Sequence, residues 1–463
     1  MKLLLLLLLT LPLLPWLTLP ALALGVAPPL QLAQVTPTED AEPATDNAAP
    51  AAATRRRAGA SGFKPSFKAG VDDVLLEVGS FNNAPEADGA ATLRASPYAL
   101  WQPMREWEFR AGLRIDGIRQ QGGAQPFTLW QANLSDTFAR WRSGDTRITA
   151  GAQTILWGRV DDVSIIDRVS RADLRRFVLD DLPERRLPQW ALRWEQTLGD
   201  YKADAVLLPA FAGSRLPHDR SVWSLINRQT GELIGIAPSD SLAALAKTAP
   251  LRQDDGGSGG AALRVTRTGV APLDFGLTLA RTRQSLPYLR LDPAGPAFTA
   301  IHPYTNFAGA DVEFATGGFT WRSEIGLTDD QPVTGLDGRQ LDSRAFDWVG
   351  GVEFFPGGDN TRVTLQLTAR NLRVNRPVLV LTEHYSVNGE IETTLDQGRW
   401  RLAASFFSGL NVRDVYVAPK VSYVGWEPHE IYLVVRAFSG ESRTLGGFHR
   451  NHDMLAIGLK TKF

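Results

Sequence analysis

Polar and apolar side chains alternate along most of the chain, and this period of two limits what the chain can fold into. In the last segment Leu455, Ile457 and Leu459 share one parity, whereas Gly458 and Lys460 share the other. Successive side chains of a β-strand point to opposite faces, so this segment has one apolar face and one small or charged face. The pattern predicts strands from about residue 105 to the end.

The length of the alternating segments indicates where these strands lie. The runs 107–116, 319–328 and 362–370 keep the alternation with few breaks. Strands of soluble proteins average ~5 to 6 residues, whereas a tilted strand needs about ten residues to cross a bilayer. The lengths therefore favour a transmembrane β-barrel over a soluble sandwich.

Reading the alternation back from Phe463 predicts an all-β, antiparallel, up-and-down barrel of about 16 strands, within a range of roughly 14 to 18. The expected strands are 105–116, 126–141, 145–156, 188–197, 201–209, 260–268, 272–282, 305–315, 318–328, 345–355, 361–372, 385–395, 398–407, 413–424, 430–438 and 452–463. Closure matters because an open edge leaves backbone groups unpaired in hydrocarbon. Short Gly-, Asp- and Asn-rich turns alternate with longer stretches, as periplasmic turns and extracellular loops do. An even strand number places both termini on the periplasmic side.

The N-terminal part of the chain has a different composition. Met1-Lys2, a leucine-rich stretch and Ala21-Leu22-Ala23 form the pattern of a cleavable secretory signal, although the apolar run is almost long enough for a membrane anchor. The following Ala- and Pro-rich segment predicts a disordered linker, and no later apolar run is long enough for a transmembrane helix. The expected organisation is a signal peptide (1–23), a linker (24–62), an N-terminal segment of open role (63–104) and a barrel (105–463).

Composition excludes several classes of function. The 49 Lys+Arg and 50 Asp+Glu residues give a formal net charge of -1, which provides no field to attract nucleic acid. The absence of Cys excludes disulfides, thiolate zinc sites and iron–sulfur clusters. His449 and His452 are only a weak suggestion of a metal site, so we predict neither a metal nor a cofactor. Gly256-x-Ser258-x-Gly260 matches a nucleophile elbow but leads into a strand rather than a helix, so no catalytic residue is predicted.

Two segments resemble known families. Phe463, behind alternating apolar residues, resembles the terminal signature by which Gram-negative outer-membrane barrels are recognised for assembly. The second segment reads Gly151-x-Gln153-x-x-x-Trp157-Gly158-x-x-Asp161, followed by Asp167, Arg171, Asp173-Leu174-Arg175 and Pro188. It looks like the Trp-Gly-x-x-Asp segment of porin-like outer-membrane families that include alginate-export-type barrels. The resemblance, over about residues 145–195 and the C-terminal strand, implies an outer-membrane location and a barrel fold.

If the apolar parity faces lipid, the charges of the other parity line the lumen. The expected basic wall is Arg362, Arg370, Arg399, Arg401, Lys420, Arg436 and Lys460. The expected acidic wall is Asp274, Asp311, Glu313, Glu324 and Glu353. A cationic wall beside an anionic wall would set up a transverse field across a narrow pore, and such a field tunes solute selectivity. The alternative is that these charges pair with one another and with loop residues in a closed lumen.

The long loop 157–187 is expected to narrow the channel. Its apolar residues suit a short amphipathic helix around 170–180, and its charged residues would let it fold into the mouth of the barrel, with its arginines meeting the acidic wall. The residues of this expected constriction are Asp161, Asp162, Asp167, Arg171, Asp173, Arg175 and Arg176. The alternative is an external loop braced by its own salt bridges. The spacing of its carboxylates matches no defined calcium loop.

These features together predict an outer-membrane porin or substrate-selective channel for passive passage of small solutes through a charged lumen. The expected partners are the lipid bilayer of the outer membrane, small solutes and, through the C-terminal strand, the barrel-assembly machinery. Two alternatives stay open. An outer-membrane hydrolase would need a convergent nucleophile, base and oxyanion donor. A structural or adhesive barrel would have a plugged lumen, and conductance in bilayers would distinguish it from a channel.

Overall fold

The computed structural model describes residues 63–160, 164–176, 179–254, 256–269, 273–292, 295–358 and 360–463. The expected signal peptide and linker lie outside the described residues. Among the helices of the described part, none is long and apolar enough to cross a membrane.

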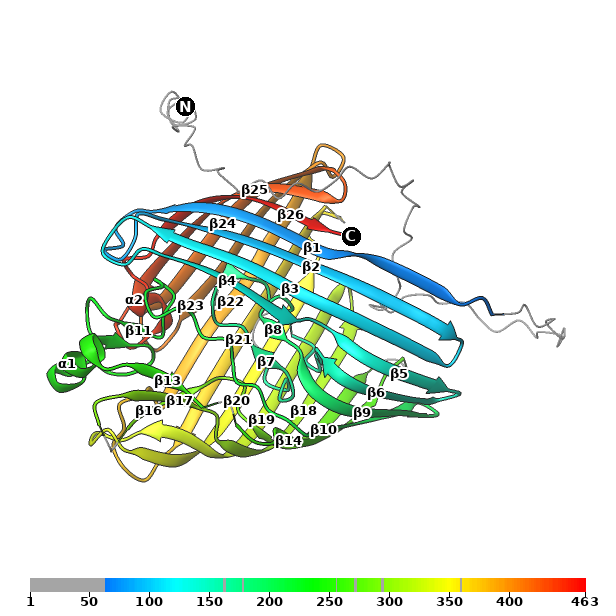
Figure 1. Cartoon of the computed structure of the whole chain (residues 1–463), viewed down its shortest axis with the longest axis horizontal. Coiled ribbons are helices and arrows are strands. Elements are labelled where there is room, and N and C mark those ends of the chain that lie inside the picture. The colour runs from blue at the N-terminus through cyan, green and yellow to red at the C-terminus, as the bar shows by residue number, and fades with distance from the viewer. Residues whose placement is uncertain are drawn as a thin grey trace. The chain divides into compact units, whose positions relative to one another are not determined.

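The main sheet has 19 strands, of which 18 close an antiparallel ring and one, β4 (Phe127–Leu134), lies outside that ring. The ring closes because β1 pairs with both β2 and β26, so the blue and red ends of the chain lie side by side in Figure 1. The ring strands are β1 (Ser66–Phe81), β2 (Gly89–Met104), β3 (Trp107–Gln121), β5 (Thr137–Ser143), β6 (Thr146–Gln153), β9 (Gln189–Leu198), β10 (Tyr201–Leu208), β14 (Gly260–Arg267), β15 (Asp274–Arg283), β18 (Tyr304–Thr316), β19 (Phe319–Thr334), β20 (Gln340–Phe354), β21 (Thr361–Arg373), β22 (Glu383–Leu395), β23 (Trp400–Gly409), β24 (Asp414–Trp426), β25 (His429–Gly440) and β26 (Met454–Lys462). The predicted fold class and strand range are confirmed.

The ring begins earlier than the sequence pattern indicated. The segment 63–104, whose role the pattern left open, forms β1 and β2, so the barrel starts at Ser66 rather than at residue 105. β2 carries Pro97 and several alanines, which weaken its alternation. The expected strand 126–141 is divided into β4 and β5 at Ser135 and Asp136, where its parity changes.

The two faces of the wall follow the predicted parity. Leu277, Leu279 and Leu327 point outward and are 56%, 61% and 58% exposed, whereas Thr278 points inward and is 1% exposed. Antiparallel neighbours keep this alternation in register across the sheet; Leu279 pairs with Leu263 on one side and with Ala308 on the other. The outer surface is consequently an apolar band, and the polar side chains gather inside.

The two ends of the ring differ. Short turns connect strands at one end, as at Gly144-Asp145 between β5 and β6, where Gly144 has a φ of +54° that glycine adopts without steric cost. Longer connections at the other end carry the small elements, which Figure 1 shows gathered there. These are β11 (Ile226–Asn227), β12 (Glu232–Leu233), α1 (Asp240–Thr248), β13 (Leu251–Gln253), β16 (Tyr288–Leu291), β17 (Phe298–Ile301) and α2 (Leu445–Phe448).

The helix expected around residues 170–180 does not begin where the pattern placed it. Arg171–Ala172 instead forms β7, which pairs with β8 (Arg186–Leu187). The apolar residues of this loop divide among three clusters: Val169 joins one inside the wall, Leu174 joins another that includes Leu225, and Leu179 packs against a third that includes Tyr432 and Val434. They therefore do not share one helix face. In the part of the chain that the structure describes, α-helices occur in two other connections, those that carry α1 and α2.

Replacing Leu279 with Arg should lower the free energy of unfolding by about 2–4 kcal/mol if the outer face lies in lipid, because a charge near the bilayer midplane loses its water. Urea unfolding of the full chain in phospholipid vesicles measures the change. The matched control, Leu279→Met, keeps the side chain apolar and should alter this free energy by less than ~1.5 kcal/mol. A loss no larger than ~0.5 kcal/mol for Leu279→Arg, as at a water-exposed site, would contradict the membrane face.

Candidate constriction site in the lumen

The connection between β6 and β9 leaves the wall and packs inside the ring. We call its described residues, 154–160, 164–176 and 179–188, the plug. Its first half, residues 154–160 and 164–169, is anchored by apolar contacts with inward-facing wall residues. These contacts keep water away from that side of the lumen. The residues of this cluster are Ile155, Trp157, Val160, Ile165, Ile166 and Val169 from the plug, and Ala191, Val206, Leu208, Ala262, Ala280, Phe307 and Val349 from the wall.

Glu324 of β19 holds the first half of the plug through backbone groups. One oxygen of this fully buried carboxylate accepts from the amide N–H of Arg159 at 2.6 Å and of Val160 at 3.2 Å. The other accepts from the amides of Ile165 at 2.8 Å and Ile166 at 3.2 Å. Four amide donors satisfy a carboxylate without a cation. Glu324, predicted as part of an acidic wall, therefore binds the plug backbone.

The Trp-Gly segment has a positional role in this anchor. Trp157 donates its indole N–H to Asp204 of β10 at 2.8 Å, and the amides of Trp157 and Gly158 donate to Asp167 Oδ1 at 2.6 and 3.0 Å. A Cβ at Gly158 would collide with the Ser164 side chain. This close approach requires glycine, and it brings the start of the plug against its later turn.

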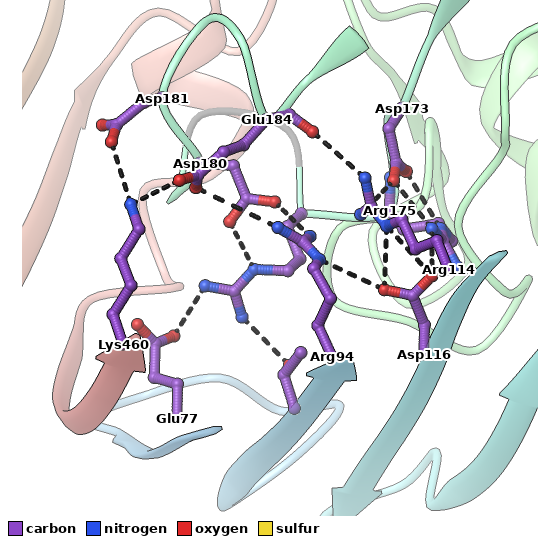
Figure 2. A network of polar contacts seen from close by, with 12 residues as sticks. Glu77, Arg94, Arg114, Asp116, Asp173, Arg175, Asp180, Asp181, Glu184 and Lys460 are labelled. Atoms are coloured by element: carbon purple, nitrogen blue, oxygen red, sulfur yellow. Dashed lines mark hydrogen bonds and ion pairs between the residues drawn. The ribbon is translucent and has the colours of Figure 1, made fainter. Parts of the chain in front are cut away.

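The second half of the plug is held by ion pairs, most of whose members are shown in Figure 2. Arg175 Nη2 lies 2.8 Å from Asp116 of β3 and 2.7 Å from Asp173. Arg114 of β3 reaches Asp173 at 2.7 Å, and Arg94 of β2 reaches Asp116 at 3.3 Å. All five side chains are at most 8% exposed. Buried charges need such partners because each loses its hydration.

A second group of ion pairs joins the plug to the place where the ring closes. Arg176 donates to Glu77 of β1 at 3.0 Å and to Asp180 at 2.6 Å. Glu77 also accepts from Arg436 of β25 at 2.8 Å and from the Tyr432 hydroxyl at 2.8 Å. One buried carboxylate on the first strand thus binds both the plug and the penultimate strand.

Lys460 of β26 completes this group. Its Nζ lies 3.2 Å from Asp181 and also forms an ion pair with Glu184, and both acids belong to the plug. Lys462 lies 3.2 Å from Glu184. The plug is therefore bound to the first three strands of the ring and to its last strand, and Glu77 joins β25 to the same group.

Ion pairs keep three of the plug carboxylates ionised. Burial by itself would raise the pKa of Asp180, but Arg176 and Arg94 outweigh burial and hold that pKa well below its ordinary value. Burial likewise opposes ionisation of Asp173, but Arg175 lowers its pKa, and Lys460 lowers the pKa of Asp181, whose side chain is 71% exposed. The plug therefore carries fixed negative charges at neutral pH.

The structure brings most of the expected constriction residues into the lumen. Asp167, Asp173, Arg175 and Arg176 are buried there, and Arg171 donates to the Gly213 carbonyl at 2.9 Å. Asp161 and Asp162 lie outside the described residues. The two arginines meet acids of β1 and β3 rather than the expected acidic wall. Arg159 is the plug arginine that reaches that wall, through Asp311 and, at 3.9 Å, Asp274.

Four residues of the expected basic wall have acidic neighbours on adjacent strands. The pairs include Arg362 with Glu390 at 2.9 Å, Arg401 with Glu392 at 3.6 Å, and Lys420 with Glu430 at 3.4 Å. The other expected wall residues also have charged partners, apart from Glu324, which binds backbone amides. Arg436 and Lys460 were described above, and Arg399 pairs with Asp396 on an exposed turn. The remaining pairs are Arg370 with Asp347, Asp311 with Arg264, and Glu313 and Glu353 with Arg322. Five charged residues of the lumen were not predicted from the sequence: Glu77, Arg94, Glu390, Glu392 and Glu430. The signal that could have identified them is their position on the polar parity of an alternating segment, which places their side chains in the lumen.

An open part of the lumen lies beside the plug. It is a cavity of about 890 Å³, lined by Arg176 and residues 179–185 of the plug and by side chains of β21 to β26. Arg362, Arg401 and Lys420 face it together with Glu390 and Glu430. Charges of both signs give this space the chemistry of a water-filled passage. No cluster of three or more metal-ligating side chains occurs among the residues that the structure describes.

A closed ring, an apolar outer face and a charged interior define a β-barrel of the transmembrane type. The chain belongs to the family described as "Protein of unknown function (DUF1302)", whose model matches residues 50–374. This match contains the whole plug and the ring strands from β1 to β21.

Several solved structures align with most of the chain. Pseudomonas aeruginosa OccK2 (OpdF), in complex with glucuronate, has a TM-score of 0.49 and 10% identity, covering 85% of this chain and 97% of that one. Acinetobacter baumannii OccAB1 has a TM-score of 0.48 and 9% identity, with coverages of 85% and 96%. Salmonella typhi OmpF, in complex with daunomycin, has a TM-score of 0.44 and 11% identity, with coverages of 86% and 97%. No curated protein matches the sequence.

Replacing Glu77 with Gln should lower the free energy of unfolding by about 3–5 kcal/mol, because Arg176 and Arg436 lose their shared buried anion. Urea unfolding in vesicles measures the loss. Glu441→Gln is the matched control: Glu441 pairs with Arg443 at 3.5 Å and both are exposed, so the expected change is about 0–1 kcal/mol. Equal effects of the two substitutions would show that Glu77 does not hold the plug and the seam together.

Proposed function

We propose that the chain is an outer-membrane channel through which small polar solutes diffuse passively. The observation that carries this proposal is the charged cavity of about 890 Å³ beside the plug, inside a closed wall with an apolar exterior. Such a wall suits a bilayer, and such an interior suits water and polar solutes. The even number of ring strands supports placing the start of β1 and the end of β26 on the periplasmic side and the long connections on the extracellular side.

No bond chemistry is part of this proposal. The buried acids of the plug are engaged by arginines and lysines, which suits positioning rather than proton transfer.

Phe463, at the end of β26, is 68% exposed, and its amide N–H donates to the Asp72 carbonyl at 3.1 Å. An exposed terminal aromatic residue supports recognition by the barrel-assembly machinery. The Trp157-Gly158 segment supports kinship with alginate-export-type barrels.

The plug makes the channel selective by narrowing it. It packs against β1 to β3 and, through its apolar residues, against the wall from β9 to β20. It leaves the space lined by β21 to β26, so the solute path runs along the charges of those six strands. The alternative is a barrel plugged for a structural role, and the number of buried ion pairs that hold the plug favours it. Conductance decides between the two.

Replacing residues 164–185 with a short Gly/Ser linker should raise single-channel conductance about two-fold or more in planar bilayers, because the open cross-section grows. The matched control replaces residues 239–249 around α1, a connection that leaves the plug intact, and should leave conductance nearly unchanged. An unchanged conductance after plug replacement would contradict the constriction. A silent native chain that conducts only without the plug would support the structural alternative.

The charges of β21 to β25 should set ion preference if solutes pass beside them. Removing two cations with Arg401→Gln and Lys420→Gln is expected to shift the reversal potential in a KCl gradient towards cation selectivity. Removing two anions with Glu390→Gln and Glu430→Gln is expected to shift it the opposite way by a similar amount, so each variant is the control of the other. If neither variant shifts the potential, the ion path does not follow this wall.

A further inference from the structure

One strand of the sheet leaves an edge unpaired. β4 pairs with β3 along one edge, and among the described residues no strand pairs with its other edge. The neighbouring ring strand, β6, ends at Gln153, where the Thr154 amide donates to Asp136 at 2.7 Å and the chain turns into the plug. β4 continues for eight residues towards the long-connection end, a length of about 27 Å at ~3.4 Å per residue. The wall therefore has a seam without a hydrogen-bond ladder.

The segment across this seam touches β4 through side chains. The His218 ring stacks on Phe127 with centroids 4.3 Å apart, Arg220 donates to the Pro126 carbonyl at 3.5 Å, and Arg215 donates to Asn133. In the described part of the chain, no backbone hydrogen bond joins residues 212–220 to β4. Three side-chain contacts separate more readily than a strand ladder. An unpaired edge is also unfavourable in dry hydrocarbon, so this edge needs a polar lining.

A side pocket opens at the seam. Its volume is about 530 Å³, within the ~300–1,000 Å³ that is usual for small-molecule sites. Leu129 and Gln131 of β4 form one wall, and the loop 215–220 and β13 form the others. Gln131 also accepts from Arg175 of the plug at 3.1 Å, so the inner end of the pocket lies against the plug.

The lining of the pocket is apolar in part and carries an excess of positive charge. Leu129, Leu216, Pro217 and Leu251 supply the apolar part. The charged lining residues are Arg215, Arg220, Arg252 and Asp219. Three cations and one anion give a net charge of +2 with His218 neutral. An apolar wall beside an arginine cluster complements a molecule with a hydrocarbon chain and an acidic head.

Apolar side chains flank the seam on its outer side. Trp130 is 60% exposed and Leu134 is 41% exposed, and both point outward from β4. Leu156, just beyond β6, is 44% exposed. A ligand that left the pocket between β4 and this flank would meet lipid before it met water.

We propose that the unpaired edge of β4 is a lateral port, where a long-chain carboxylate binds with its head among Arg215, Arg220 and Arg252 and passes between the pocket and the outer leaflet. This path crosses the wall and is separate from the axial path of the proposed function. It rests on the proposed membrane location, but it does not require axial conduction.

Binding is tested with the full chain in phospholipid nanodiscs and the fluorescent probe 11-(dansylamino)undecanoic acid, with empty discs as background. Arg220→Gln combined with Arg252→Gln should weaken binding roughly ten-fold, because the charged head loses two partners. The matched control is Arg339→Gln with Arg344→Gln, two exposed arginines elsewhere on the long-connection end, and it should bind like the native chain. Equal weakening by both pairs, or equal binding of the uncharged 11-(dansylamino)undecanol, would overturn the assignment.

Passage is tested by closing the seam. Because the chain has no Cys, Asn133→Cys with Arg215→Cys can be bridged by a short bis-maleimide, and the same variant without the linker is its reference. Bridging should slow transfer of the bound probe to acceptor vesicles roughly ten-fold and leave ion conductance unchanged. Leu327→Cys with Phe346→Cys, paired across the closed β19–β20 seam, is the control and should leave transfer unchanged.

The two measurements keep the two proposals apart. Unchanged transfer after bridging, or transfer and conductance that fall together, would overturn the lateral port. Absence of conductance in every variant, with probe transfer still blocked by bridging, would overturn the axial channel and support the port.

Discussion

Inside a membrane every backbone N–H and C=O group has to find its partner within the protein, because hydrocarbon offers none. The ring meets this constraint by pairing β1 with β26, so that each ring strand has a neighbour on both sides. β4 is the place where the wall departs from this order. The chain enters the plug at the same place, after Gln153. The filling of the lumen and the unpaired edge therefore have one origin, the early end of β6.

The interior of the barrel poses a second requirement, which concerns charge. Arg94, Arg175 and Arg176 lose their water when the plug packs against β1 to β3, and only close carboxylates make that burial tolerable. Ion pairs of this kind contribute little net stability but accept few alternative arrangements. The apolar cluster around Ile166 supplies burial without such directionality. The apolar contacts therefore keep the plug inside the barrel, and the ion pairs determine its orientation there.

The sequence alone predicts the wall far better than the lumen. Alternation identifies which side of β15 or β26 faces outward, because parity is a local property of a strand. It misses β2, where Pro97 and the alanines dilute the signal. The ion pairs escape it, since Glu77 meets Arg176 and Arg436 only once the ring has closed, and nothing local links these positions. Arg362, Arg401 and Lys420 are found by parity, but the acids beside them depend on strand register.

Glu77 lies on the first strand to be synthesised, and Arg436 and Lys460 lie on the last two. The plug, made in between, binds both ends of the chain, so it can act as a template that draws β26 towards β1. Its ionic contacts are incomplete until translation has ended. Folding of this barrel is therefore completed late, when the last strands close the ring around a plug that belongs to the same chain. A chain that lacked β25 and β26 would have neither a closed ring nor the partners that hold the plug.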